Sequence, residues 1–342
     1  MNVGTEKRAV LLLAHGTPDV LGEMAEYLSR VTGGRALPPE AVEELQHRYA
    51  QIGLRETPGV EAPPLTKWTM TQGHLLQQAL NGESVYVGMR NWHPYIADVV
   101  AQMRRDGVTH IKAVCLAPQN SRTSVGLYRR AVLAATAGME VAFVAGWAEN
   151  PTLAEAFAER LRPVWTKACA EAGQRVPVLF TTHSVPCRTI MTGEASVAGS
   201  RPGTPMQLSP DPYPVEAKRT AQMVSDRMAS AGFGDRDWCF AFQSQGMSGG
   251  PWVGPTVEDT LKAIRDEGHV GVVMQPVGFL CDHVEILYDI DIAFRELAGE
   301  LGLKLWRAES LNDSGLLVKA LAEVVSGEYK ATVDEVTVPA GV

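Results

Sequence analysis

Two histidines occupy the same kind of place in the sequence, directly after a short apolar segment and just before a turn. His15 follows the segment 9–14 and opens the run His-Gly-Thr-Pro, and His183 follows the segment 176–182 and opens the run His-Ser-Val-Pro. In an α/β sheet, side chains at the carboxyl ends of the strands face the crevice where ligands bind. A neutral imidazole accepts a proton near pH 7, so His183 is a candidate base and His15 a second candidate for chemistry. The alternative for either one is a loop residue without a chemical role, and the repeated placement counts against it.

Three carboxylates follow at helical spacing in the second half of the chain, at Asp282, Glu285 and Asp289. Asp282 is expected to cap a helix, and the three acids then share one face of that helix. The opposite face carries the apolar stripe that is expected to be buried, made of Leu287, Ile290, Phe294 and Leu297. Carboxylates bind hard cations weakly enough to release them, so the row is suited to relaying a divalent cation. The alternative is a solvated acidic face that favours the helix dipole.

Strand-like and helical segments that could position these side chains alternate along the chain. The strand-like segments are short, apolar and poor in charge, and are expected at 9–13, 84–87, 111–116, 141–144, 176–181, 238–242 and 270–274. Segments with apolar residues three and four apart lie between them, such as 94–106 and 256–267, and each of these two is followed by a glycine. Uniformly apolar strands that alternate with helices indicate parallel sheets covered by helices on both faces, a Rossmann-like α/β architecture.

The two halves of the chain resemble each other. Besides its histidine turn, each half has a later strand-like segment that runs into a proline and a polar loop, at Pro118 in the first half and Pro276 in the second. The pattern predicts two similar α/β domains, 1–150 and 151–311, with a cleft between them where the ligand binds. The final helix, 312–328, is a candidate to pack back on the first domain.

The composition argues against several classes of protein. The chain has 342 residues, of which 45% are apolar and 20% charged, so it can build two cores. A formal net charge of −8 without a block of Lys or Arg leaves no footprint for nucleic acid. No apolar run is long enough for a signal peptide or a transmembrane segment, so a cytoplasmic protein is expected. The five cysteines lie far apart, which argues against a structural zinc site and a disulfide framework. No sustained heptad pattern calls for an oligomer, and a monomer is expected.

Motifs in both halves resemble those of the ferrochelatase family in order and spacing. In the second half they are Thr182-His183-Ser184-Val185-Pro186, Asp211-Pro212-Tyr213-Pro214, Phe242-Gln243-Ser244-Gln245, Gly250-Pro251-Trp252-Val253-Gly254-Pro255, Pro276-Val277-Gly278-Phe279 and Asp282-His283-Val284-Glu285. In the first half they are His15-Gly16-Thr17-Pro18, Arg48-Tyr49-Ala50-Gln51-Ile52-Gly53 and Gly88-Met89-Arg90-Asn91-Trp92-His93-Pro94. The similarity covers about residues 8–327, nearly the whole chain.

This resemblance implies an enzyme that inserts Fe2+ into a porphyrin, with a chelatase-like fold of two domains. By similarity His183 takes the pyrrole protons and is joined at the metal by Glu285, and Asp289 holds a hydrated cation on its way in. His15 stands where relatives carry an apolar residue or tyrosine that approaches the macrocycle from the opposite side, and it could be an axial ligand to the product iron. The scattered cysteines do not match the cluster with which some relatives hold an iron-sulfur centre, so no cofactor is expected beyond the substrate Fe2+.

The resemblance also bears on the choice of porphyrin. Relatives that use protoporphyrin IX tend to have a long apolar lip in the first half, whereas the segment 32–40 of this chain is short and polar. This favours coproporphyrin III, and protoporphyrin IX stays possible. Matched to the family motif, Arg48 and Tyr49 are the expected donors to the propionates, and Ser121, Arg122 and Thr123 are weaker candidates. The alternative for all five is surface solvation.

Two further classes of function stay open, and one is disfavoured. Imidazole and carboxylate do not strongly distinguish late divalent metals, so a cobalt or nickel chelatase of a related tetrapyrrole is the nearest rival. A non-catalytic protein that binds a tetrapyrrole or a metal would share the fold and the cleft. Ser184 beside His183 suggests a serine hydrolase, but the small glycines of a nucleophile elbow do not flank it.

Overall fold

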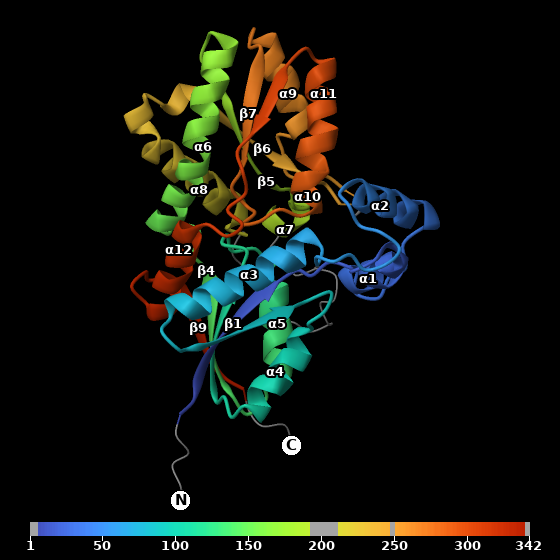
Figure 1. The fold of residues 1–342 in the computed structure, drawn as a ribbon, viewed down its shortest axis with the longest axis vertical. Helices are drawn as coiled ribbons and strands as arrows, with labels where there is room; N and C mark the ends of the chain where they lie inside the picture. Colours follow the sequence, from blue (N-terminus) through green and yellow to red (C-terminus); the bar gives the residue numbers. More distant parts are fainter. Residues whose placement is uncertain (1–5, 192–210, 247–249, 339–342) are drawn as a thin grey trace, which may run out of the picture. The chain divides into compact units, whose positions relative to one another are not determined.

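The computed structural model describes residues 6–191, 211–246 and 250–338. The described chain divides into two compact units (Figure 1). Unit 1 consists of Met1–Trp147 together with Leu317–Val342, and unit 2 consists of Ala148–Leu316. Each unit has its own sheet and its own helices.

The sheet of unit 1 runs in the order β2-β1-β3-β4-β9. Its strands are β1 (Arg8–Ala14), β2 (Ser84–Met89), β3 (His110–Cys115), β4 (Glu140–Gly146) and β9 (Thr332–Thr337). β1 to β4 are parallel, and β9 is antiparallel to β4 at the edge. The apolar pattern predicts the four parallel strands but not β9, because four of the six residues of β9 are polar or charged and most of the six are exposed.

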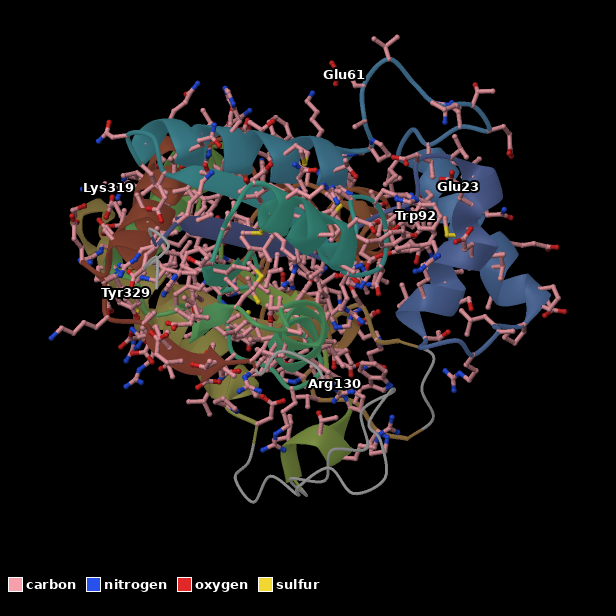
Figure 2. The ribbon with its side chains drawn as sticks, turned by 90° about the horizontal axis from the view of Figure 1, so that it is seen from below. Glu23, Glu61, Trp92, Arg130, Lys319 and Tyr329 are labelled. Atoms are coloured by element: carbon pink, nitrogen blue, oxygen red, sulfur yellow. The ribbon has the colours of Figure 1, made fainter. Side chains whose placement is uncertain are left out.

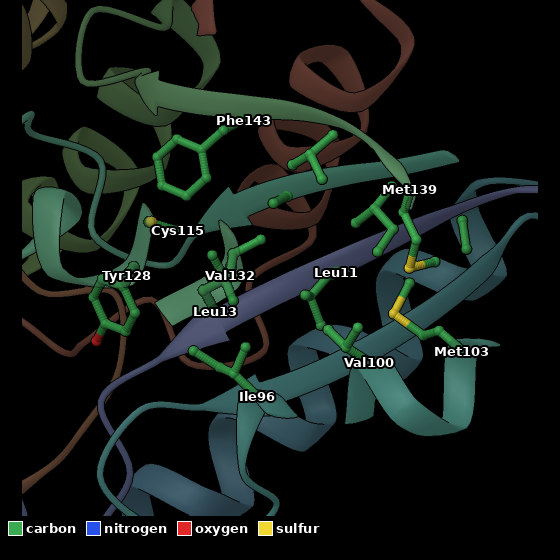
Figure 3. Packing of buried hydrophobic residues seen from close by; sticks show 14 of the residues in the cluster. Leu11, Leu13, Ile96, Val100, Met103, Cys115, Tyr128, Val132, Met139 and Phe143 are labelled. Carbon is green, nitrogen blue, oxygen red and sulfur yellow. The ribbon is translucent and has the colours of Figure 1, made fainter. Parts of the chain in front are cut away.

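Helices cover both faces of this sheet. The helices of unit 1 are η1 (Leu21–Glu23), α1 (Met24–Val31), α2 (Pro39–Gln51), α3 (Pro64–Ala79), α4 (Ile96–Arg105), α5 (Val125–Ala135) and α12 (Gly315–Ser326). Of these, η1, α1 and α2 contact mainly one another rather than the strands. On one face, buried residues of α4 and α5 such as Val100 and Val132 pack against Leu11 and Leu13 of β1 (Figure 3). On the other face α3 approaches closely at Gly73, where an added Cβ would lie 2.5 Å from a methyl group of Val87.

The sheet of unit 2 runs in the order β6-β5-β7-β8, and all its strands are parallel. They are β5 (Val178–His183), β6 (Trp238–Gln243), β7 (Gly271–Pro276) and β8 (Lys304–Arg307). Every residue of β7 is buried, as expected of a central strand covered on both faces. The short β8 is not predicted from its sequence, because two of its four residues are charged.

The helices of unit 2 lie on the two faces of its sheet. They are α6 (Pro151–Ala172), α7 (Cys187–Met191), α8 (Tyr213–Arg227), η2 (Ala229–Ala231), η3 (Asp235–Asp237), α9 (Val257–Asp266), α10 (Val284–Leu287), η4 (Asp289–Phe294) and α11 (Arg295–Glu300). α6 and α8 cover one face, and α9 with the α10–α11 segment covers the other (Figure 1).

The segment that carries the acidic row differs from the single α-helix expected after Asp282. It consists of α10, the π-helical turn η4 and α11. The buried stripe is Ile286, Ile290, Phe294 and Ala298, whereas the predicted Leu287 and Leu297 are only partly buried. In an α-helix, residues four apart drift around the axis by about 40° per step. The wider π-turn compensates for that drift, so residues four apart all face the sheet.

Candidate active site

His183 and Glu285 meet in unit 2. His183 is the last residue of β5, and Glu285 lies in the first turn of α10. His183 Nε2 is 3.3 Å from Glu285 Oε1, and each side chain is about a third exposed, at 34% and 29%. The other ring nitrogen, Nδ1, forms a short hydrogen bond to the carbonyl oxygen of Ser184. Because a carbonyl can only accept, the proton on Nδ1 is fixed and Nε2 is left to face the carboxylate.

A second imidazole contacts the same carboxylate. His283 Nε2 lies 3.5 Å from Glu285 Oε2. His283 Nδ1 is 2.9 Å from the carbonyl oxygen of Cys281, so this ring is also oriented by a backbone acceptor. Glu285 therefore lies between two imidazoles that both present Nε2. His283 was not among the predicted site residues, although it stands two positions before Glu285 in the motif that matches the family.

The charges of the pair shift both of its pKa values. Burial alone would lower the pKa of His183, but the charge and hydrogen bond of Glu285, helped by the Ser184 carbonyl and by Asp289, raise the pKa to about 9. Burial alone would raise the pKa of Glu285, but the contacts with His183 and His283 hold it well below its usual range. At neutral pH the metal-free pair is therefore an imidazolium and a carboxylate.

Asp289 lies next in this row, at the start of η4. It is buried, and the hydroxyl of Ser244 donates a short hydrogen bond to its carboxylate. Ser244 has a left-handed backbone, with φ of 58°, in the turn that follows β6. Asp289 is close enough for its charge to raise the pKa of His183. Across the described ranges, however, no group of three or more His, Cys, Asp or Glu side chains is arranged to hold a metal ion.

Asp282 does not act as the helix cap that its position suggests. The residue at the N-cap of α10 is His283, with no side-chain cap bond. The Asp282 carboxylate instead accepts hydrogen bonds from Ser310 Oγ at 2.7 Å and from Asn312 Nδ2 at 3.0 Å. Arg307 Nη1 lies 3.5 Å from it. The expected row of three acids is thus reduced to Glu285 and Asp289, because Asp282 binds Arg307, Ser310 and Asn312 instead.

His15 belongs to a polar cluster in unit 1. The Asn91 amide nitrogen lies 2.9 Å from His15 Nε2, and the Tyr27 hydroxyl lies 3.1 Å from Nδ1. The Gly16 carbonyl oxygen lies 3.2 Å from Nδ1, so Nδ1 has an acceptor and Nε2 faces the Asn91 amide. An iron bound through Nε2 would then have to displace the Asn91 amide. Neither Tyr27 nor Asn91 was among the predicted site residues, although Asn91 stands in a motif that matches the family.

Aromatic side chains surround this cluster. The Tyr27 ring packs edge-on against Trp92, with centroids 6.2 Å apart, and against Tyr49, with centroids 6.5 Å apart. Figure 2 shows Trp92 beside the helical segment that carries Glu23. The structure thereby brings the predicted Tyr49 into the same aromatic group as His15, through Tyr27.

The other predicted donors of unit 1 lie on two separate elements. Arg48, near the end of α2, is partly exposed and donates from Nε to Glu44 at 2.9 Å, one helical turn earlier. Ser121, Arg122 and Thr123 lie between β3 and α5. The Ser121 hydroxyl is buried in this turn, 2.8 Å from Thr123 Oγ1, and accepts from the Thr123 backbone at 3.2 Å. The side chains of Ser121 and Thr123, both predicted propionate donors, therefore already bind each other within the turn.

Comparison with known proteins agrees with this architecture. The family model described as ferrochelatase matches residues 7–329. A ferrochelatase from Acidobacterium capsulatum is 57% identical over 337 residues, which cover 98% of this chain and 99% of that protein. A coproporphyrin III ferrochelatase from Geobacillus kaustophilus is 30% identical over 326 residues, or 92% of this chain and 94% of that protein. The structure of SirB from Bacillus subtilis with Fe3+ aligns with a TM-score of 0.50 at 10% identity, covering 94% of both chains. The predicted α/β fold with helix-flanked parallel sheets is confirmed.

Proposed function

This chain belongs to the ferrochelatase family and is a lyase of heme biosynthesis that inserts metal into a porphyrin, and we propose that its porphyrin is coproporphyrin III. The connection between α1 and α2 supports this choice, because residues 33–36 are exposed and the stretch is too short and polar to form an apolar lip. Among the described helices, none has the length and apolar character needed to cross a membrane. The Geobacillus kaustophilus relative is named for this substrate, whereas the Acidobacterium capsulatum relative is named for the reaction alone.

We assign the chemistry to His183 and Glu285, and the observation that carries this assignment is their 3.3 Å contact. Without metal, His183 is protonated at neutral pH, because its pKa is raised to about 9. A divalent cation at Glu285 would cancel the charge that stabilises the imidazolium, so the pKa of His183 would fall and Nε2 would lose its proton. Arrival of Fe2+ thus makes His183 a base, which accepts the two displaced pyrrole protons one at a time and, being about a third exposed, releases each to water.

Asp289 is the proposed earlier stop for the hydrated cation. Its carboxylate is buried and held by Ser244, and it belongs to the same segment as Glu285. Because Asp282 is bound by other side chains, only Asp289 and Glu285 remain as carboxylates along which the cation can pass. We propose no cofactor beyond the substrate Fe2+ and a monomeric enzyme, which metal analysis and light scattering of the purified protein would check.

The proposed porphyrin contacts lie in unit 1. They are His15, Arg48 and Tyr49, with Ser121, Arg122 and Thr123 as further candidates near the propionates. Coproporphyrin III carries propionates where protoporphyrin IX carries vinyl groups, so it gains more from cationic donors. A hydrogen bond to a charged group contributes about 1.5–3 kcal/mol. One added Arg–propionate contact therefore predicts a preference of ~10-fold or more in kcat/KM.

The test is a comparison of the two porphyrins. Purified protein is incubated anaerobically with Fe2+, or with Zn2+ as a surrogate, and initial rates are followed from the absorbance of coproporphyrin III and of protoporphyrin IX. Coproporphyrin III should have the higher kcat/KM, and Arg48→Gln should narrow the difference. Arg55→Gln is the matched control, because its guanidinium donates to backbone carbonyls of its own segment, at Ala50 and Leu54. An equal or reversed preference in the wild type would overturn the coproporphyrin assignment.

The catalytic pair is tested in the same assay. His183→Ala removes the proton acceptor, and Glu285→Gln removes the charge while keeping the shape of the side chain. Loss of a positioned acid or base costs on the order of 10²–10⁴-fold in rate. Activity within a few-fold of the wild type in either variant would show that the base or the metal ligand lies elsewhere.

A further inference from the structure

The backbone carbonyls of His183 and Glu285 are each held by a buried side chain from another element. The Tyr213 hydroxyl, from the first residue of α8, donates to the carbonyl of His183 at 3.0 Å. The Gln243 amide nitrogen, from the last residue of β6, donates to the carbonyl of Glu285 at 2.7 Å. Tyr213 is 8% exposed and Gln243 is 1% exposed, so water competes little for either contact.

Tyr213 is itself fixed from two sides. The Asp211 carboxylate accepts from the Tyr213 backbone N–H at 3.1 Å, which sets the start of α8. The Thr182 hydroxyl lies 2.6 Å from the Tyr213 hydroxyl. Because Tyr213 gives its only hydroxyl proton to the His183 carbonyl, Thr182 must be the donor in this second contact. The order of donation therefore runs from Thr182 through Tyr213 to the backbone of His183.

Gln243 connects the two halves of the catalytic pair. In the sheet it lies beside His183, and its carbonyl accepts from the Ser184 backbone N–H at 2.7 Å. Its side chain reaches the Glu285 carbonyl on the next layer. One residue thus binds the strand end that carries the imidazole and the helix that carries the carboxylate. Glu285 lies in the first turn of the α10–α11 segment, where the backbone N–H groups have no helical partners and the helix end frays most easily.

We infer that Tyr213 and Gln243 are positioning residues that set the distance between the His183 imidazole and the Glu285 carboxylate. The inference rests on the proposed catalytic roles of His183 and Glu285. Without these two contacts the end of β5 and the first turn of the α10–α11 segment could each shift, and a shift of about 1 Å in reacting groups costs on the order of 10²-fold in rate. The two anchors act on the backbone, so they restrain the pair without occupying the atoms that bind metal or protons.

The experiment removes each donor and keeps the bulk of the side chain. Tyr213→Phe deletes the hydroxyl, and Gln243→Met replaces the amide with an apolar chain of similar length. Tyr86→Phe is the control for the first, because the Tyr86 hydroxyl donates to Asp106, in unit 1. Gln275→Met is the control for the second, because Gln275 is equally buried at the end of β7 but donates to the carbonyl of Pro276.

Two readouts separate positioning from a loss of folding. Initial rates of Zn2+ insertion give kcat and KM, and kcat should fall by about 10- to 100-fold in Tyr213→Phe and Gln243→Met while KM for the porphyrin changes by less than about threefold. NMR of imidazole-labelled protein at one fixed pH follows His183, whose signal is identified by its absence in His183→Ala. That signal should move in both anchor variants and stay in place in both controls.

Each outcome decides a different point. A wild-type protein that metallates no porphyrin refutes the proposed function itself. An active wild type whose anchor variants keep kcat within threefold refutes positioning. A fall in kcat that the controls share, or one that leaves the His183 signal unmoved, also refutes it, because the loss would then come from general destabilisation.

Discussion

Replacing Glu285 by Gln should change the stability of the metal-free protein in a way that depends strongly on pH. The pKa of His183 is about 9 in the folded protein, compared with an ordinary value of 6.5. One pKa unit corresponds to about 1.4 kcal/mol, which sets an upper bound of roughly 3 kcal/mol for the stabilisation of the imidazolium. Since the two side chains are 34% and 29% exposed, solvent screening reduces this to about 1–2 kcal/mol.

The sign of the effect follows from the direction of each pKa shift. The pKa of His183 is raised on folding, so its contribution is fully present below pH 6.5 and is lost as the pH rises through about 9. The pKa of Glu285 is lowered on folding, so its contribution is present above the unfolded value of 4.5 and is lost as the pH falls below that value. The pair therefore stabilises the fold most between about pH 4.5 and 6.5.

Urea unfolding of the metal-free wild type and of Glu285→Gln, from pH 5.5 to 9.5, measures this effect. The free energy of unfolding should be lower in the variant by about 1–2 kcal/mol near pH 6, and the difference should shrink towards zero above pH 9. Glu267→Gln is the control, because Glu267 also faces a histidine, His269 at 3.8 Å, but is 69% exposed. A difference for Glu285→Gln that is the same at pH 6 and pH 9.5 would refute the charged pair.

Two further substitutions test the packing that supports the site. Gly278→Ala should lower the free energy of unfolding by about 1–3 kcal/mol, because the new Cβ would lie 2.0 Å from Thr182 Oγ1. Gly299→Ala, with nothing within 4 Å and in the helix α11, should raise it by up to about 1 kcal/mol in the same urea titration. Arg307→Met should lower the thermal midpoint, because Arg307 is 14% exposed and binds both oxygens of Asp291 at 2.8 and 2.9 Å. Removing one partner of a buried ion pair costs about 3 kcal/mol, and calorimetry showing a loss below about 1 kcal/mol would mean that solvent replaces the guanidinium.

Much of the framework follows from local patterns. The strands β1 to β7 are largely apolar runs bounded by turns, and such runs are recognisable because a strand covered on both faces carries little charge. β8 and β9 are not recognisable in this way, because half or more of their residues are polar or charged and their composition no longer differs from that of a loop, whereas the edge strands β2 and β6 keep an apolar run. The π-turn at 289–294 could not be predicted from local sequence either, because packing against the sheet produces it rather than the conformational preference of its own residues.

The sequence by itself indicated the residues to which we assign the chemistry. A histidine at the end of an apolar strand and a glutamate in a distinctive motif mark His183 and Glu285, since both signals are local in the chain. Only the tertiary structure decided how they are used. The partners of Asp282 lie 25 to 30 residues further along the chain, and the anchors Tyr213 and Gln243 come from elements 30 and 42 residues away from the carbonyls they hold. Contacts over such separations depend on how the strands and helices pack, and no spacing within a motif encodes them.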